Sequence, residues 1–218
     1  MVVLHGHMEQ SVKVGKAAAG KAVKAGKRQI DPEEKKTRVV QTARRLFVQL
    51  GYHNVSIPDI VKDSGVSTGA IYSYFPNKEA LARHIHEQTL DEFHSLFCQR
   101  LADRSTAYQK LRTFAELVYE LAESDPDVME YLLFMRHGEF MQGAAPICFS
   151  EPFRMIRQII AEGMKNGEIR QGDVFLSGVS FTGAILRAAE LRFRCVLDRP
   201  LTEIAEPLIA NAWAAIKS

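Results

Sequence analysis

The segment from Ser56 to Phe75 constrains the fold of this chain more than any other, because it reads as two short helices separated by a tight turn. Ser56 is placed to cap the first helix, and Asp59 three residues later can complete a capping box. Gly65 should end that helix, since glycine enters left-handed backbone conformations without a steric penalty from a Cβ atom. Ser67 can then cap a second helix. The pattern predicts a helix-turn-helix that presents its second helix to a DNA groove.

The second helix is expected to run from Thr68 to Phe75 and to have two faces. Ile71 and Phe75 are four residues apart, so they share one face and should pack into the core. The other side chains should point outward, and they are Thr68, Gly69, Ala70, Tyr72, Ser73 and Tyr74.

The stretch Gly65–Leu81, GVSTGAIYSYFPNKEAL, resembles the DNA-reading segment of the TetR/AcrR family of transcriptional regulators. The similarity begins upstream, at Ala43–Phe47 and Gly51–Tyr52, and covers about 50 residues. The resemblance implies an all-α chain, with an N-terminal three-helix helix-turn-helix domain followed by a helical effector-binding and dimerisation domain. It also implies a sequence-specific DNA-binding regulator, in the form of a repressor released from its operator by a small hydrophobic or amphipathic effector. It does not identify that effector.

The resemblance also assigns DNA contacts. It implies that Tyr72 meets the DNA backbone or a thymine methyl and that Lys78 binds phosphate. It implies that bases or sugars are faced by Thr68, Gly69, Ala70, Ser73 and Tyr74. Ser56, at the start of the first helix, completes the candidate DNA-binding set. The chain departs from the family pattern at Pro58, where a polar or basic residue is frequent, and at Ser73, where a bulkier one is common. We therefore expect fewer base contacts from these two positions.

Three regions are predicted along the 218 residues: a basic flexible arm over 1–30, the helix-turn-helix domain over 31–78, and the effector-binding and dimerisation domain over 79–218. A composition of 46% hydrophobic residues supports a core in each of the two larger regions. Asp31 followed by Pro32 is a strong helix start, and Asn77 should cap a longer helix. The apolar stripe of that longer helix is predicted to be Leu81, Ile85, Phe93, Leu96, Phe97 and Leu101.

The basic charge is concentrated in the arm. Residues 1–30 hold six Lys and Arg against one acid, residues 31–100 hold nine of each, and residues 101–218 hold thirteen against sixteen. The arm is rich in Lys, Ala and Gly and has little apolar surface to bury, so it should be disordered when free. Two interpretations stay open for it: an arm that tracks phosphates or the minor groove, or a solvated tail.

Beyond residue 103 the periodicity predicts helices near 106–124, 127–140, 152–166, 173–197 and 202–217. In the last two, small residues stand among large apolar ones, which permits close helix approach. The resemblance places a dimer-forming four-helix bundle there, and a two-fold operator favours a two-fold protein. Packing within one chain is the alternative.

The middle helices should hold the effector pocket. The candidate lining is mostly apolar and aromatic, which suits a hydrophobic or amphipathic ligand; it comprises Phe114, Val118, Tyr119, Leu133, Phe134, His137, Phe140, Phe149, Phe153 and Ile156. Ordinary core packing is the alternative for any one of them. Arg136, Glu139 and Arg157 can orient a ligand or pair on the surface.

Other classes of function find little support. The chain lacks a phosphate-binding glycine loop and the common hydrolase and metalloprotease motifs, so we expect no enzyme, although a helical enzyme without a motif is an alternative. A second alternative is an architectural DNA-binding protein that uses the arm and takes no ligand. The histidines at 84 and 86 point to different faces, and we expect no metal and no cofactor.

The three cysteines, Cys98, Cys148 and Cys195, lie far apart in the sequence. They should be reduced and mostly buried thiols, with a redox role for Cys148 as the alternative. No apolar run reaches the length of a membrane span, so a cytoplasmic protein is expected.

Overall fold

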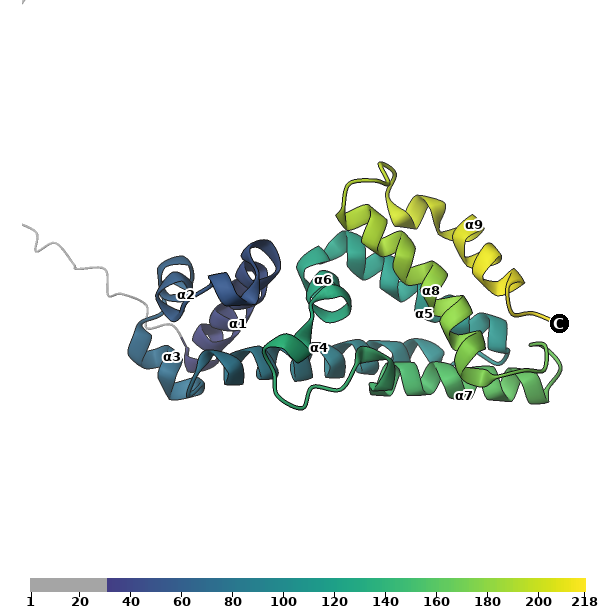
Figure 1. Ribbon diagram of the computed structural model, residues 1–218, viewed down its shortest axis with the longest axis horizontal. Helices are drawn as coiled ribbons and strands as arrows, with labels where there is room; N and C mark the ends of the chain where they lie inside the picture. Colours follow the sequence, from purple (N-terminus) through teal and green to yellow (C-terminus); the bar gives the residue numbers. More distant parts are fainter. Residues whose placement is uncertain (1–30) are drawn as a thin grey trace, which may run out of the picture. The chain divides into compact units, whose positions relative to one another are not determined.

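The structure is a computed structural model that describes residues 31–218 (Figure 1). The predicted basic arm, residues 1–30, lies outside the described residues. Within 31–218 the elements are helical, and the one strand-like pairing is an isolated bridge between Ile169 and Lys217. The prediction of an all-α fold is confirmed.

The first helix, α1 (Pro32–Leu50), begins and ends as the sequence predicts. The Asp31 carboxylate accepts a hydrogen bond from the Glu33 amide, and Pro32 occupies the first turn, where no intrahelical amide partner is needed. The helix ends at Gly51, whose φ of 83° is readily adopted by glycine. A short 3₁₀ turn, η1 (Tyr52–Asn54), then leads to the helix-turn-helix.

The helix-turn-helix consists of α2 (Ile57–Ser64) and α3 (Thr68–Tyr74). Ser56 and Asp59 form the predicted capping box, and Gly65 adopts the left-handed conformation, with φ 67° and ψ 12°. The Ser67 hydroxyl accepts from the Ala70 amide and so caps α3. Each of these local sequence predictions is confirmed.

Ile71 and Phe75 are buried, as predicted, in a core that also contains Phe47, Ile60 and Leu81. Burying side chains of this size contributes about 1.5–3 kcal/mol each before conformational entropy is counted. The same core takes in Tyr131 from a later helix. The core beneath the helix-turn-helix therefore includes a residue more than fifty positions beyond α3 in the sequence, and the boundary at residue 78 stays a prediction.

The long helix α4 (Lys78–Leu101) starts at Asn77, whose side chain accepts from the Ala80 amide, as expected. It connects α1 with the C-terminal helices, against which its second half packs (Figure 1). Phe93 and Phe97 are buried on the predicted stripe, but Leu96 is 37% exposed. Leu96, like its neighbour Ser95, lies on the solvent side of the helix, so its inclusion in the predicted apolar stripe was wrong.

The C-terminal part is built around α5 (Ala107–Ser124), which contacts α4 and each of the helices that follow. These are α6 (Pro126–Phe134), α7 (Glu151–Lys165), α8 (Val174–Phe193) and α9 (Leu201–Ala214). Helices α8 and α9 lie side by side (Figure 1). Much of α8 is apolar enough to resemble a membrane span by length and composition, a test that core helices of soluble proteins also pass.

Two of the predicted helices were too long. Helix α6 ends at Phe134 because Met135 takes extended backbone angles, φ −72° and ψ 140°, and the chain then forms the short turns η2 (His137–Glu139) and η3 (Ile147–Phe149). Helix α8 ends at Phe193, because Cys195 adopts a positive φ of 54° and the amide of Val196 donates back to the Leu191 carbonyl.

The prediction that the cysteines are mostly buried was wrong for two of them. Cys98 and Cys195 are exposed, and Cys148 is half-buried. Cys195 follows the end of α8, in the turn with positive φ, and Cys98 lies on α4 at the exposed edge of its contact with α7. Helical periodicity predicts which face a residue occupies, but a single small side chain carries too little hydrophobicity to fix that face.

Candidate functional site

The outer face of α3 carries the polar positions that were predicted to read DNA. Thr68, Gly69 and Ser73 are exposed, and Tyr72 is 50% exposed. Ala70 is half-buried. Because Ile71 anchors the opposite face at 0% exposure, this short helix presents a fixed set of small and aromatic side chains to the surface. Their contacts with DNA stay a prediction.

Tyr74 differs from the other residues of this face. Its ring is half-buried, and its hydroxyl donates a 3.0 Å hydrogen bond to the backbone carbonyl of Pro32 at the start of α1. The hydroxyl therefore holds α3 against α1. A contact between Tyr74 and a base or sugar requires the ring edge, or the loss of this bond.

Lys78 is also engaged within the protein. Its Nζ donates to the carbonyl oxygens of Tyr52 and Val55, both at 2.8 Å, and lies 4.1 Å from the centre of the Tyr52 ring. Partial burial lowers the pKa of the ammonium group. An ammonium group has three hydrogens, so one stays free for a phosphate oxygen. Lys78 thus braces the turn before α2 whether or not DNA is present.

Ser56 is exposed, but both its polar groups serve the cap of α2. Its amide donates to an Asp59 carboxylate oxygen at 2.8 Å, and its hydroxyl accepts from the Asp59 amide at 3.3 Å. Hydrogen bonds from the hydroxyl and then from the amide hold the pKa of the Asp59 carboxyl below its usual value. The residue fixes where α2 begins, and any phosphate contact is additional to that role.

The ten predicted pocket residues do not line one cavity. An apolar space of about 160 Å³ lies between α7 and α8; we call it the α7–α8 cavity. Its lining includes two of the ten, Phe153 and Ile156. The rest of its lining is Ile147, Cys148, Arg157, Phe175, Gly178, Val179, Thr182, Gly183 and Leu186.

A second space, of only about 10 Å³, lies among α4, α5 and α6, and we call it the α4–α5 cavity. Four of the ten predicted residues line it: Phe114, Val118, Leu133 and Phe153. Ile147 and Phe153 are common to both cavities. The Phe153 ring meets that of Phe114 edge-on, at 5.9 Å between centroids. Ile147 and Phe153, which line both spaces, therefore separate the two cavities.

The remaining predicted pocket residues line neither cavity. His137 and Phe140 belong to an aromatic cluster with Tyr52 and Tyr131. Phe134 packs edge-on against Phe193, and Phe149 is 63% exposed.

Tyr119 lines a separate polar hollow between α5 and α9, beside Arg112 and Glu206. Its hydroxyl is buried and finds no hydrogen-bond partner among residues 31–218, and burial raises its pKa. Arg112 pairs with Glu116 within α5 and with Glu206 across this hollow. The second ion pair joins α9 to α5.

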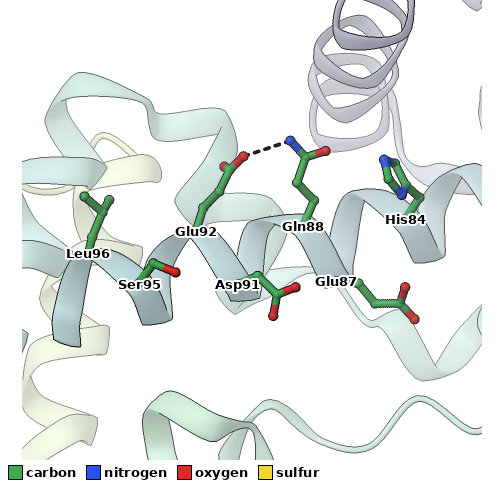
Figure 2. A pocket seen from close by; sticks show the side chains of 7 residues that line it. All are labelled: His84, Glu87, Gln88, Asp91, Glu92, Ser95 and Leu96. Carbon is green, nitrogen blue, oxygen red and sulfur yellow. Dashed lines mark hydrogen bonds between the residues drawn. The ribbon is translucent and has the colours of Figure 1, made fainter. Parts of the chain in front are cut away.

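A wide hollow of about 700 Å³ runs along one face of α4 and is open to solvent. Figure 2 shows that the side chains around it all come from α4, with Gln88 donating to Glu92 at 2.8 Å. A single helix cannot enclose a ligand. The α7–α8 cavity is accordingly the better candidate for a small molecule.

The α8 side of this cavity was not predicted from the sequence. Gly178 was expected in a bundle interface or a core, and Thr182 was not singled out, yet both are buried against the cavity. One signal was available, since Gly178 and Thr182 are four apart and share a face. Arg157 was weighed as a ligand-orienting residue, and it lines the cavity while donating to the Cys148 carbonyl at 2.5 Å. By contrast, Arg136 and Glu139 pair with each other on the surface.

Residues 39–85 match the family described as "Bacterial regulatory proteins, tetR family". This stretch runs from the middle of α1 into α4 and includes the whole helix-turn-helix.

Two curated relatives extend the similarity. The "Fatty acid metabolism regulator protein" of Bacillus subtilis is 26% identical over 151 residues, which cover 67% of this chain and 77% of the relative. The "HTH-type transcriptional regulator UidR" of Escherichia coli is 26% identical over 141 residues, covering 65% of this chain and 58% of the relative. Both are named as regulators, and neither name indicates catalysis.

Solved structures share the fold. The fatty acid degradation regulator FadR from Bacillus halodurans superposes with a TM-score of 0.71 at 18% identity, covering 82% of this chain and 94% of that one. FadR from Bacillus subtilis in complex with stearoyl-CoA gives 0.67 at 21% identity, covering 83% and 98%. At these identities the likeness concerns the fold.

Proposed function

Because this chain belongs to the tetR family of transcriptional regulators, we propose that it is a dimeric, cytoplasmic repressor that leaves its operator when an amphipathic small molecule binds. The observation that carries the proposal is the pairing of an exposed, rigidly capped recognition helix with an apolar cavity in the C-terminal helices.

The DNA-binding step uses α3. Two copies related by a two-fold axis place two such helices in successive major grooves, about one helical turn apart. Thr68 and Ser73 are exposed hydroxyls on this helix, suited to base edges or phosphates. Tyr72 adds an exposed aromatic ring that can contact a thymine methyl group.

The dimer uses α8 and α9. On α8 three large apolar side chains are exposed, Phe175, Leu176 and Val179, at 44%, 63% and 52%, and Phe175 and Val179 also line the α7–α8 cavity. Such a contiguous patch on a helix is costly in water and is suited to a partner surface. A second copy of the chain supplies a matching patch by symmetry.

The effector we propose has an apolar tail and an anionic head. The α7–α8 cavity is lined by apolar side chains, with the Arg157 guanidinium as its charged group. A guanidinium binds carboxylates and phosphates through paired hydrogen bonds. Long-chain acyl-CoA combines both properties, and a relative with this fold is described in complex with stearoyl-CoA.

Binding must enlarge the cavity. Drug-sized ligands occupy roughly 300–1,000 Å³, whereas the α7–α8 cavity holds about 160 Å³. A rotation of Phe153, which stands between this cavity and the α4–α5 cavity, would join the two spaces. Because the second space lies against α4, ligand entry would press on the helix that begins at the DNA-binding end.

The experiment is selection of operator DNA from random duplexes by the full-length protein, followed by titration of the complex with stearoyl-CoA, free stearate and free CoA. We expect a palindromic consensus and release by stearoyl-CoA at concentrations where CoA has no effect. Binding without sequence preference would instead support an architectural protein. A specific operator from which none of the three ligands releases the protein would overturn the acyl-CoA assignment alone.

A further inference from the structure

Three side chains of the kinds that can bind metal ions meet on the surface where α4 packs against α7. His94 and Cys98 are four residues apart on α4, so they share a face, and Met155 reaches them from α7. The Cys98 Sγ lies 3.3 Å from His94 Nε2 and 3.8 Å from Met155 Sδ. Cys98 is exposed and the other two are half-buried, so the group is open to an ion from solvent.

These distances are close to those within a metal coordination sphere. With metal–sulfur bonds of about 2.3 Å and metal–nitrogen bonds of about 2.0 Å, ligands separated by 110–120° lie roughly 3.5–3.7 Å apart for S and N, and roughly 3.8–4.0 Å apart for two S atoms. The two separations measured from Cys98 Sγ need to change by only a few tenths of an ångström. Without an ion, weak hydrogen bonds through the thiol hold the same three atoms together.

The chemistry of the three donor atoms determines which metal ion this site should prefer. Among residues 31–218, no three His, Cys, Asp or Glu side chains gather closely enough to hold a metal ion, so the third donor here has to be the thioether. Thiolate and thioether sulfur favour copper(I), whereas magnesium, calcium and manganese prefer oxygen ligands. The nearby Glu151 carboxylate is ion-paired with Arg154 and hydrogen-bonded to it. A soft monovalent ion therefore matches the site.

We propose that His94, Cys98 and Met155 bind one copper(I) ion per chain. The bound ion would join α4 to α7 through bonds that cross the helix interface. The site is separate from the α7–α8 cavity, whose lining contains none of these three residues, and it does not depend on the proposed effector. Sequence patterns do not reveal it, because the third ligand lies 57 residues beyond the second.

The test is an anaerobic copper(I) titration of the reduced full-length protein against bicinchoninate as the competing chelator. We expect one tightly bound ion per chain. Cys98→Ser, His94→Gln and Met155→Leu should each weaken binding by more than the roughly 10- to 100-fold that loss of an outer-shell partner costs. Met155→Leu conserves volume and should leave the helices packed, which circular dichroism can check.

The matched control is a variant in which the other two thiols are removed, Cys148→Ser with Cys195→Ser. It should bind one copper(I) ion with the affinity of the parent. X-ray absorption of the loaded control should show two sulfur ligands and one nitrogen. If folded Met155→Leu and His94→Gln bind copper(I) as the parent does, the ion is held by a thiol alone and the proposed site is wrong. Operator binding without copper is unaffected by either result.

Discussion

The hydroxyl of Tyr131 on α6 donates a 2.8 Å hydrogen bond to the backbone carbonyl of Ala82 on α4. Tyr131 is fully buried, and its burial raises the pKa of the phenol, so it stays neutral and remains a donor at all ordinary pH values. An Arg44–Asp125 ion pair of 3.5 Å also joins the helix-turn-helix side to the start of α6. The C-terminal helices therefore contact the DNA-binding helices through specific polar bonds as well as apolar packing.

The first prediction concerns this hydrogen bond. Tyr131→Phe keeps the ring and removes the donor, so the free energy of unfolding should fall by about 0.5–1.5 kcal/mol. Chemical denaturation of the full-length protein measures this. Tyr72→Phe is the matched control. Because the Tyr72 ring is half exposed, removal of its hydroxyl should leave the free energy of unfolding unchanged. Equal stability of parent and Tyr131→Phe would mean that the bond contributes nothing net.

The second prediction is an acid-sensitive contribution from His137. This residue is 8% exposed, and its ring centroid lies 4.3 Å from that of His86, 5.0 Å from Tyr131 and 5.7 Å from Phe140. Burial, and next the charge of a protonated His86, lower the pKa of His137 to about 3. Burial also lowers the pKa of His86, where Glu87 opposes the shift and Arg83 adds to it.

A histidine whose pKa is lower in the folded state is favoured by folding in its neutral form. The free energy of unfolding therefore keeps its full value above the unfolded pKa of about 6.5 and decreases as the pH falls toward the folded pKa. Between pH 7.5 and pH 5 the loss from His137 should reach about 2 kcal/mol. His137→Phe should show a smaller decrease in unfolding free energy over this interval. The measurement is denaturant unfolding at pH 7.5, 6.5 and 5. An identical pH dependence in parent and variant would contradict the assignment to His137.

Local sequence signals predicted the helix-turn-helix well, because each depends on residues within one turn of each other. Ser56 and Asp59 cap one helix, and the φ of Gly65 ends it, without help from the rest of the chain. The end of α6 could not be predicted in this way. His137 leaves the helical path and is buried against His86, a contact that joins residues fifty positions apart.

The ligand site illustrates the same limit. Phe114 and Val118 were correctly expected to face the interior, but periodicity cannot say whether an interior face meets a cavity or another side chain. Gly178 and Thr182 look like ordinary packing residues until α7 is placed opposite them. Residues that share a helix face are predictable, and the partner of that face is not.

The third prediction separates base readout from structural support at the recognition helix. Thr68→Ala and Ser73→Ala remove exposed hydroxyls, so each should cost about 1–3 kcal/mol on the selected operator and little on random DNA. Stability should be unchanged in Thr68→Ala and little changed in Ser73→Ala, because the Ser73 hydroxyl donates only to the Ala70 carbonyl within α3, at 2.7 Å. Tyr74→Phe should instead lower thermal stability, because its hydroxyl bonds to the Pro32 carbonyl. Fluorescence anisotropy on both DNAs, with melting curves, measures these effects.

Lys78→Ala should resemble Tyr74→Phe in stability and should also weaken binding to both DNAs. Its ammonium group holds two backbone carbonyls and can contact a phosphate, which carries no sequence information. If Thr68→Ala and Ser73→Ala weaken operator and random DNA by the same factor, α3 does not read bases through these hydroxyls.

The last prediction tests Arg157 as the group that receives the anionic head of an effector. Arg157 lines the α7–α8 cavity, whereas Arg154, three residues earlier on α7, is exposed and paired with Glu151. Arg157→Gln should raise the stearoyl-CoA concentration needed for operator release by about tenfold or more, which corresponds to the loss of a charged hydrogen bond of about 1.5–3 kcal/mol.

Arg154→Gln should leave that concentration unchanged. Neither variant should alter operator affinity without ligand, because both side chains lie on α7, remote from α3. Release of both variants at the parent's stearoyl-CoA concentration would show that the acyl-CoA head group binds elsewhere, even if the apolar tail occupies this cavity.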